Sequence, residues 1–301
     1  MRIVVTGGPD GQVLLSLMER GAARGHEIVA LGRPELDLAG DGDAVAKAVE
    51  ATRPDAIVSA AAYTAVDKAE TERDLAFAIN GSGAGAVAQA AQSLGVPIVH
   101  VSTDYVFDGS NASAYSEDDP TGPVSVYGES KLAGEQAVLA ASQNAAVLRT
   151  AWVYSPFNAN FVKTMLRLAS DREEVGVVGD QFGNPTSALD IADAIIAVIE
   201  NLAASEDSTL RGTFHMTGQG EASWAEFAEQ IFAASAEAGG PTARVRSITT
   251  AEYPTPAARP ANSRLDSSKL ERIHGVRLPD WRRSTDEVVR RLVAEMKQGH
   301  I

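Results

Sequence analysis

The sequence contains no cysteine, and this absence removes several kinds of site at once. A disulfide framework, a cysteine nucleophile, a thiolate zinc site and an iron–sulfur cluster are all excluded. Basic residues are also scarce, because 26 Lys and Arg stand against 40 Asp and Glu and give a net charge of -14. We therefore expect neither a dedicated nucleic-acid binder nor a protein of anionic membrane surfaces. Basic residues that meet an anionic substrate must be gathered locally.

Long apolar runs are missing as well. The longest, residues 56–66 and 191–199, fall short of the ~20 residues that a membrane span needs, or are interrupted by Asp193. The first residues enter a strand pattern directly, without the apolar stretch and cleavage site of a signal peptide. We expect a cytoplasmic protein without membrane contact. Its 301 residues, 45% of them hydrophobic, suit one large globular domain or two smaller ones.

The first half of the chain alternates short β-branched runs with longer alanine-rich segments. The pattern predicts strands over residues 3–6, 27–31, 56–60, 97–102 and 146–150, and helices over 12–24, 44–52, 74–94 and 128–142. This order implies right-handed crossovers and a parallel, doubly wound α/β sheet of the Rossmann type. Residues 1–150 are therefore predicted to form a dinucleotide-binding domain.

In the second half of the chain, predicted strands and helices alternate less regularly. Helices are predicted over residues 161–169, 189–202, 223–236 and 285–297, strands over 175–178 and 212–217, and a proline-rich loop over 253–262. We interpret residues 151–301 as mainly a smaller C-terminal α/β substrate-binding domain, with some segments returning to the first domain.

A glycine-rich turn follows the first predicted strand. Gly8 and Gly11 fill the first two places of a Gly-x-x-Gly-x-x-Gly turn, whereas Leu14 stands in the third. Such a turn lets the backbone approach a pyrophosphate, and the following helix offers free N–H groups. A tight turn that binds no ligand is the alternative.

The end of the second predicted strand bears on the choice of cofactor. Sites that prefer NAD commonly carry an acid there, which holds the ribose 2′-hydroxyl. Here the strand ends in Gly32 and Arg33 instead. Arg33 could pair with the 2′-phosphate of NADPH, and a solvated surface arginine is the alternative. We expect NADPH as the cofactor, with NADH as the alternative.

One tyrosine, Tyr127, has a lysine four residues on, Lys131. This spacing places both side chains on one helix face, where the ammonium can lower the phenol pKa from about 10 and favour proton donation. Thr103 and Asp104 follow the fourth strand, at the sheet edge where ligands of such folds bind. The hydroxyl of Thr103 could bind a carbonyl that is being reduced. An exposed helix with an incidental pair is the alternative.

These residues resemble the extended short-chain dehydrogenase/reductase family, whose signature is a Ser/Thr, Tyr and Lys triad. Seven blocks resemble the dTDP-4-dehydrorhamnose reductases within it: residues 60–70, 102–107, 127–135, 149–154, 163–167, 180–186 and 259–265. The resemblance spans residues 1 to about 282. It implies reduction by NADPH or NADH of the C4 ketone of a dTDP-4-keto-6-deoxy-L-sugar to give dTDP-L-rhamnose.

The resemblance also implies roles for single residues. Tyr127 would donate the proton, Lys131 would tune it and hold the nicotinamide ribose, and Thr103 would orient the ketone. Asp104 and Trp152 would contact the sugar, and Arg259 the substrate diphosphate. The implied cofactor contacts are Gly11, Gln12 and Val13 at the pyrophosphate, Asp37 and Leu38 at the adenine, and Ala62, Tyr63 and Thr64 in the middle. The glycine turn and the end of the second strand, described above, add Gly8 and Arg33 to these contacts. Tyr63 replaces an expected histidine, and Trp152 could instead be a core aromatic.

Two other functions remain open at this point. The chain could reduce another nucleotide-linked 4-keto-deoxysugar, or it could be a non-catalytic NADP-binding regulatory subunit. Some family members dimerise around a magnesium ion held by glutamates, but this chain has Ser16 and Leu189 at the matching places. We expect no metal, and a monomer or a weak metal-independent homodimer. A shifted ligand set built on Glu19 and Asp190 is the alternative.

Overall fold

A computed structural model describes residues 1–299. Its centre is a parallel sheet of six strands in the order β10-β5-β4-β3-β1-β2. The strands are β1 (Arg2–Thr6), β2 (Glu27–Leu31), β3 (Ala56–Ser59), β4 (Ile98–Thr103), β5 (Ala145–Thr150) and β10 (Gly212–His215). The winding direction reverses between the neighbouring strands β1 and β3, as in a doubly wound sheet, and the predicted α/β fold class is confirmed.

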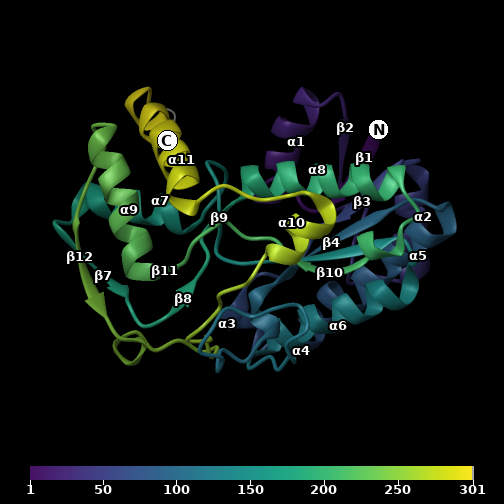
Figure 1. The fold of residues 1–301 in the computed structure, drawn as a ribbon, viewed down its shortest axis with the longest axis horizontal. Helices are drawn as coiled ribbons and strands as arrows, with labels where there is room; N and C mark the ends of the chain where they lie inside the picture. Colours follow the sequence, from purple (N-terminus) through teal and green to yellow (C-terminus); the bar gives the residue numbers. More distant parts are fainter. Residues whose placement is uncertain (300–301) are drawn as a thin grey trace.

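Helices cover both faces of this sheet (Figure 1). One face packs against α2 (Gly42–Ala51), α5 (Ala84–Leu94) and α6 (Val126–Ala141), and the other against α1 (Gln12–Ala23) and α8 (Ala188–Ala204). Successive strand residues alternate between the two cores, so that Val4 faces α2 and α5 while Ile3 and Val5 face α1 and α8. The three successive apolar residues of β1, Ile3, Val4 and Val5, therefore follow from burial on both faces.

The helix predicted over residues 74–94 is interrupted. It consists of α4 (Arg73–Phe77), a π-helical turn η1 (Ala78–Gly83) and α5. Inside this turn, Asn80 accepts a hydrogen bond from the Tyr63 backbone N–H at 2.7 Å and donates to Ser130 Oγ at 2.9 Å. These two hydrogen bonds connect η1 to α6 and to the loop after β3. The same loop contains the short helix α3 (Val66–Ala69). Helical periodicity alone does not reveal such a bulge.

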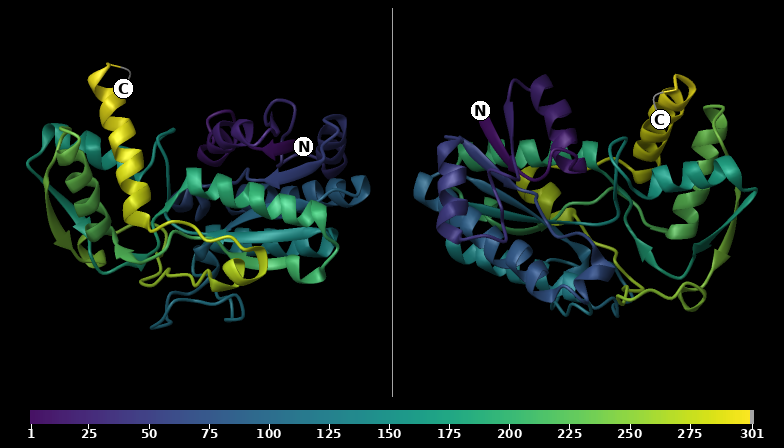
Figure 2. Two further views of the ribbon diagram at one scale, coloured as in Figure 1. Left: turned by 45° about the horizontal axis from the view of Figure 1, so that its top comes forward. Right: turned by 180° about the vertical axis from the view of Figure 1, so that it is seen from behind.

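A second lobe lies beside the sheet and carries the C-terminal helix, while the N-terminus lies in the sheet lobe (Figure 2). Its core packs α7 (Phe161–Asp171), α9 (Trp224–Glu237) and α11 (Trp281–Lys297) on the parallel pair β7 (Glu174–Val178) and β12 (Arg244–Ile248). Two short pairs complete it: β6 (Val153–Tyr154) with β9 (Thr186–Ser187), and β8 (Phe182–Gly183) with β11 (Ala222–Ser223).

Three elements of the second half pack on the sheet lobe rather than on the second lobe. They are α8, β10 and α10 (Ser268–His274), whose apolar residues join the core beneath α1. The elements absent from the sequence prediction are α3, α10, β12 and the two-residue strands. β12 carries two exposed arginines, and a two-residue strand is too short to show alternation.

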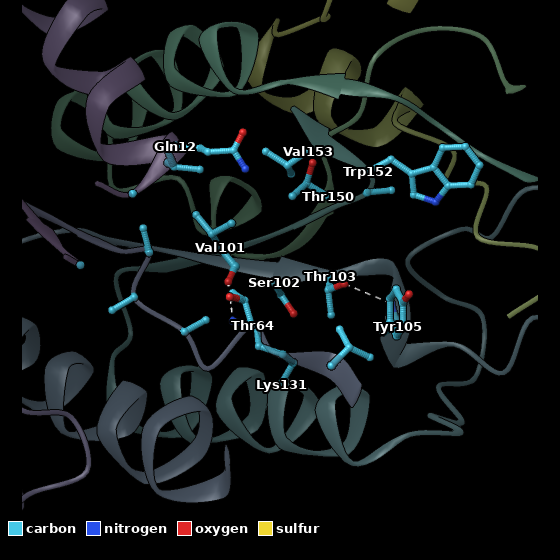
Figure 3. A pocket seen from close by; sticks show the side chains of 18 of the residues that line it. Gln12, Thr64, Val101, Ser102, Thr103, Tyr105, Lys131, Thr150, Trp152 and Val153 are labelled. Carbon is cyan, nitrogen blue, oxygen red and sulfur yellow. Dashed lines mark hydrogen bonds between the residues drawn. The ribbon is translucent and has the colours of Figure 1, made fainter. Parts of the chain in front are cut away.

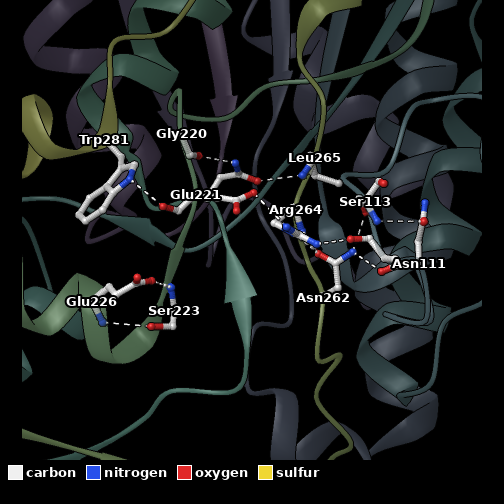
Figure 4. A network of polar contacts seen from close by, with 12 residues as sticks. Asn111, Ser113, Gly220, Glu221, Ser223, Glu226, Asn262, Arg264, Leu265 and Trp281 are labelled. Carbon is white, nitrogen blue, oxygen red and sulfur yellow. Dashed lines mark hydrogen bonds and ion pairs between the residues drawn. The ribbon is translucent and has the colours of Figure 1, made fainter.

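A polar network fastens the two lobes near the C-terminal loop (Figure 4). Asn262 donates to the carbonyl oxygens of Asn111 and Ser113 at 2.7 Å each, and Arg264 pairs with Glu221 at 3.0 Å. The proline-rich loop predicted over residues 253–262 is irregular and follows the 3-10 turn η4 (Thr250–Glu252). Its C-terminal end is therefore held against the sheet lobe. None of the helices in residues 1–299 combines the length and apolar character needed to cross a bilayer.

Candidate active site

A cavity of about 600 Å³ opens at the carboxyl ends of the sheet strands, beside the second lobe (Figure 3). Eleven residues predicted for the site line it: Gly8, Gly11, Gln12, Val13, Ala62, Thr64, Thr103, Asp104, Tyr127, Lys131 and Trp152. A second cavity of about 310 Å³ adjoins the glycine turn and is lined by Arg33, Leu38 and Ala62 among others. Asp37, Tyr63 and Arg259 line neither cavity.

The glycine turn leaves the first turn of α1 open to a ligand. Gly11 precedes α1 as its N-cap, and no side chain caps the helix there. The first N–H groups of a helix have no partner within it, so here they are available to an anion. Leu14, in the third place of the motif, is 2% exposed and packs into the sheet core. The side-chain oxygen of Gln12 accepts from Ser155 Oγ at 2.7 Å, which links the turn to the second lobe.

The position of the Tyr127–Lys131 pair is set by close contacts of α6 with two neighbouring backbone segments. A Cβ on Gly134 would overlap the carbonyl oxygen of Asn80, and a Cβ on Gly128 would overlap that of Tyr105. Glycine at both positions lets α6 lie directly on its neighbours. The helix begins after Ser125, whose hydroxyl accepts from the Gly128 N–H.

Tyr127 is a half-buried side chain beside Thr103. Its ring meets that of Tyr105 edge-on, with centroids 5.4 Å apart. Burial raises the pKa of Tyr127 above its usual value, the charge of Asp104 adds to this, and a hydrogen bond with Thr103 opposes it. The expectation of a phenol pKa lowered by Lys131 is wrong, because desolvation outweighs any effect of the ammonium. The phenol is therefore held in the protonated form.

The Lys131 ammonium lies between α6 and β4 and is 2% exposed. It donates to the carbonyl oxygen of Val101 at 2.7 Å, as Figure 3 shows, and lies 3.4 Å from Nε2 of His100. Burial lowers the pKa of Lys131 to about 8, and the charge of Glu135 opposes this. Lys131 is thus a buried cation that titrates close to neutral pH.

Thr103 and Asp104 form a polar pair at the end of β4. Thr103 Oγ1 donates to Asp104 Oδ1 at 2.9 Å, and Asp104 is 2% exposed. Burial raises the pKa of Asp104 to about 6, while the nearby hydroxyl groups of Ser263 and Thr103 oppose this. The other carboxyl oxygen, Oδ2, is buried without a hydrogen-bond partner in the described part of the chain. An unpartnered acceptor in a cavity wall suits a polar ligand group.

The buried ion pair between Glu135 and Arg149 lies next to the site and was not predicted from the sequence. Glu135 accepts two hydrogen bonds from Arg149 at 2.9 and 2.7 Å, and a third from Ser102 at 2.6 Å. Glu135 lies four residues after Lys131, so the i, i+4 spacing that singled out Tyr127 and Lys131 extends to it. This spacing could have identified Glu135 as a residue near the site.

Trp152 forms one wall of the cavity in an unusual backbone conformation. Its φ is 49°, and its ring stacks on Trp224 with centroids 3.6 Å apart. A Cβ on Gly183 would meet the indole at 2.5 Å, so glycine is needed beneath the ring. Trp224 also lines the cavity, and Phe161 packs against it. Both tryptophans line the cavity and also pack on the core of the second lobe.

Several other predicted residues are engaged with partners outside the cavities. Arg259 makes two hydrogen bonds to Asp67 at 3.1 and 3.0 Å. Tyr63 donates through its hydroxyl to Glu72 at 2.6 Å. Arg33 and Asp37 face each other at 3.6 Å with exposed side chains.

The acids considered for a magnesium site also have partners. Glu19 pairs with Arg291 at 2.8 Å, and Asp190 accepts from Ser284 at 2.6 Å. Ser16 donates back to the carbonyl oxygen of Gln12 in its own helix. Within residues 1–299, no group of three or more His, Asp or Glu side chains is placed to hold a metal ion.

Comparison with known proteins gives a consistent result. A family model described as the RmlD substrate binding domain matches residues 1–294. A dTDP-4-dehydrorhamnose reductase of Sinorhizobium fredii is 52% identical over 299 residues, which is 99% of this chain and 100% of that protein. One from Escherichia coli is 42% identical and covers 91% of this chain and 92% of its own length. The structure of a Bacillus anthracis dTDP-4-dehydrorhamnose reductase in complex with NADP has a TM-score of 0.87 at 37% identity, covering 95% of this chain and 98% of that one.

Replacing Asp104 with asparagine is expected to stabilise the protein most at alkaline pH. Because the pKa of about 6 in the folded chain exceeds the ordinary 3.8, the folded state favours the protonated acid. The stability due to the protonated acid is full below about pH 4 and is lost as pH rises through 6. Asp104→Asn keeps an acceptor for Thr103, and its unfolding free energy should exceed that of the wild type by up to about 3 kcal/mol at pH 8.

At pH 5 the gain should be about half as large, since most folded molecules then carry the protonated acid. Urea unfolding of both proteins at the two pH values measures it. Asp108→Asn is the matched control, because hydrogen bonds from Ser110 and Tyr115 lower the pKa of that exposed aspartate and its replacement should destabilise. An equal gain for Asp104→Asn at both pH values would contradict the buried-charge explanation.

Proposed function

Because this chain belongs to the family of dTDP-4-dehydrorhamnose reductases, we propose that Thr103, Tyr127 and Lys131 carry out its reaction. That reaction is the NAD(P)H-dependent reduction of the C4 ketone of dTDP-4-dehydro-β-L-rhamnose to dTDP-L-rhamnose. The observation that carries the residue assignment is the cavity between the glycine turn and Trp152, which Tyr127 and Lys131 line from one helix.

The residues present fit a dinucleotide. The uncapped start of α1 suits a pyrophosphate, which Gly8, Gly11, Gln12 and Val13 would hold. The smaller cavity suits the adenosine end, with Leu38 in its wall and Arg33 at its rim. Ala62 and Thr64 would contact the middle of the cofactor. A neighbour of known structure binds NADP, which supports NADPH for this chain.

Tyr127 supplies the proton in the proposed mechanism. The reduced nicotinamide supplies the hydride that reaches C4. The C4 oxygen then takes on alkoxide character, and an alkoxide is a stronger base than a phenolate, so the proton moves from the Tyr127 hydroxyl to that oxygen. Thr103, which lies next to Tyr127 in the cavity wall, would hold the carbonyl oxygen in place. The positive charge of Lys131 would stabilise the phenolate left behind. Two of its three N–H groups are used within the protein, so the third would remain to bind the nicotinamide ribose.

The substrate side of the cavity is formed by the second lobe and the end of β4. We assign the sugar to Asp104, through its unpartnered Oδ2, and to the face of Trp152. Arg259 would reach the diphosphate only by giving up or sharing its contacts with Asp67. A guanidinium can bind two acceptors at once, which suits both partners.

Tyr127→Phe should reduce kcat by about 10²–10⁴-fold, because the transferable proton is lost. The NADPH dissociation constant should change little, because the ring and its packing remain. Steady-state rates of NADPH oxidation and a fluorescence titration measure the two quantities. Tyr105→Phe removes the neighbouring hydroxyl and should cost far less. A Tyr127→Phe enzyme with more than half of the wild-type kcat would refute the role.

The wild type should use NADPH at least as well as NADH, and Arg33→Ala should abolish any preference for NADPH. A contact between a guanidinium and a phosphate is worth about 1.5–3 kcal/mol, which corresponds to tenfold discrimination or more. The ratio of kcat/KM for the two cofactors measures it. Arg24→Ala is the control, since that exposed arginine pairs with Glu200 and lines neither cavity. A clear wild-type preference for NADH would show that Arg33 does not act in this way.

We further propose that activity needs no metal and that the chain is a monomer or a weak dimer. The ion pair of Glu19 with Arg291 and the hydrogen bond of Asp190 with Ser284 support this, because both acids are already satisfied. Light scattering and activity should be unchanged by EDTA. A dimer that dissociates on chelation, with falling activity, is the contrary result.

A further inference from the structure

Three buried side chains form a row behind the proposed active site. Lys131 Nζ lies 3.4 Å from Nε2 of His100, and Nδ1 of His100 lies 3.0 Å from Ser59 Oγ. The relative exposure of Lys131, His100 and Ser59 is 2%, 0% and 1%. The row runs from the cavity wall into the sheet lobe, and neither His100 nor Ser59 lines the cavity.

The partners of His100 determine its protonation. Burial lowers the pKa of His100 well below its usual value, and the Lys131 charge adds to this, so the imidazole is neutral. An ammonium has only donors, so the ring nitrogen facing it must be an acceptor. The proton of the ring is therefore on Nδ1, which donates to Ser59 Oγ.

The sheet and α6 hold this row in place. Ser59 and His100 are register partners at the end of β3, so their side chains lie next to each other on one face. On β4, His100 and Ser102 face α6, where they meet Lys131 and Glu135 respectively. The close approach of α6 at Gly134, whose added Cβ would lie 3.5 Å from Nε2, holds the imidazole against the helix.

We propose that His100 is a positioning residue for Lys131, with Ser59 fixing its tautomer. His100 and the Val101 carbonyl together hold two of the three ammonium N–H groups. The third is then directed into the cavity that Lys131 lines. This inference rests on the role proposed above for Lys131 in binding the cofactor and supporting Tyr127.

Several other groups near the ammonium bear on its titration. On α6, Glu135 raises the pKa of Lys131, but it is already paired with Arg149 from β5. Beyond β4, Asp104 interacts with Tyr127, the neighbour of Lys131 one turn earlier. From η1, Asn80 lies against Gly134 and is uncharged. His100 is therefore the neutral acceptor whose loss should change Lys131 without altering the net charge around it.

The test compares two replacements of His100 in the full-length protein. His100→Leu removes the acceptor at similar volume, whereas His100→Gln retains an amide oxygen that can reach the ammonium. Loss of an acceptor disfavours the charged amine, so His100→Leu should move the alkaline limb of kcat/KM for NADPH to lower pH by about one unit. NADPH binding, followed by fluorescence titration, should weaken by roughly tenfold at pH 8.5 and much less at pH 6.5. His100→Gln should restore both.

Lys131→Ala separates this inference from the assignment beneath it. If Lys131→Ala leaves NADPH affinity, its pH dependence and kcat unchanged, the proposed role of Lys131 fails and the positioning role fails with it. If Lys131→Ala is impaired while folded His100→Leu has the wild-type pH profile, only the positioning role is refuted. Should His100→Leu not fold, Ser59→Ala takes its place. It frees the Nδ1 proton to move to Nε2, and the same limb should shift in the same direction by a smaller amount; an unchanged profile overturns the proposal.

Discussion

The direct contact of α6 with β4 and η1 is the constraint on which the site depends. Gly128 and Gly134 remove the two Cβ atoms that would hold the helix away from the carbonyls of Tyr105 and Asn80. At this separation, one stripe of α6 meets one face of β4. The stripe carries Tyr127, Lys131 and Glu135 at i, i+4 spacing, and the facing strand residues are His100 and Ser102. Thr103, the last residue of β4, lies beside Tyr127 where the strand ends. The four-residue spacing on the helix and the two-residue spacing on the strand thus bring a proton donor, a cation and an ion pair next to one another.

Burial shifts the pKa values of these side chains, and it also lowers the stability of the folded protein. It raises the pKa of Tyr127, raises that of Asp104 to about 6 and lowers that of Lys131 to about 8. Each charge out of water requires partners. Arg149 and Glu135 satisfy each other, and Ser102 adds a hydrogen bond to the carboxylate. Asp104 keeps one oxygen without a partner, which is a cost in stability that a polar substrate group could relieve.

The second lobe completes the cavity from the other side. Gln12, Ser155 and Asn160 share hydrogen bonds across the start of α1, so the pyrophosphate turn is tied to the segment that follows Trp152. The Trp152 ring is held between Trp224 and the bare backbone of Gly183. The contact of Gln12 with Ser155 and that of Trp152 with Trp224 each join residues more than 60 positions apart in the chain. The sugar-facing wall is thus built from elements that no single motif contains.

Local pattern in the sequence was sufficient for the layered α/β architecture and for most of the cavity lining. Apolar runs predicted the strands, since burial on both faces leaves no room for polar alternation. Gly8, Gly11 and Thr103 follow from their places at strand ends, and Tyr127 and Lys131 from their spacing on one helix. Tertiary structure alone decided the rest. Whether Lys131 lowers the pKa of Tyr127 depends on how much water is removed from both, and the return of α8 and β10 to the sheet depends on which apolar face needs covering. The pairing of Arg259 with Asp67 and the row of Ser59, His100 and Lys131 likewise arise from contacts between distant segments. Spacing along a chain specifies neighbours within one helix or strand, whereas charge, desolvation and partner choice are set by the segments that pack against it.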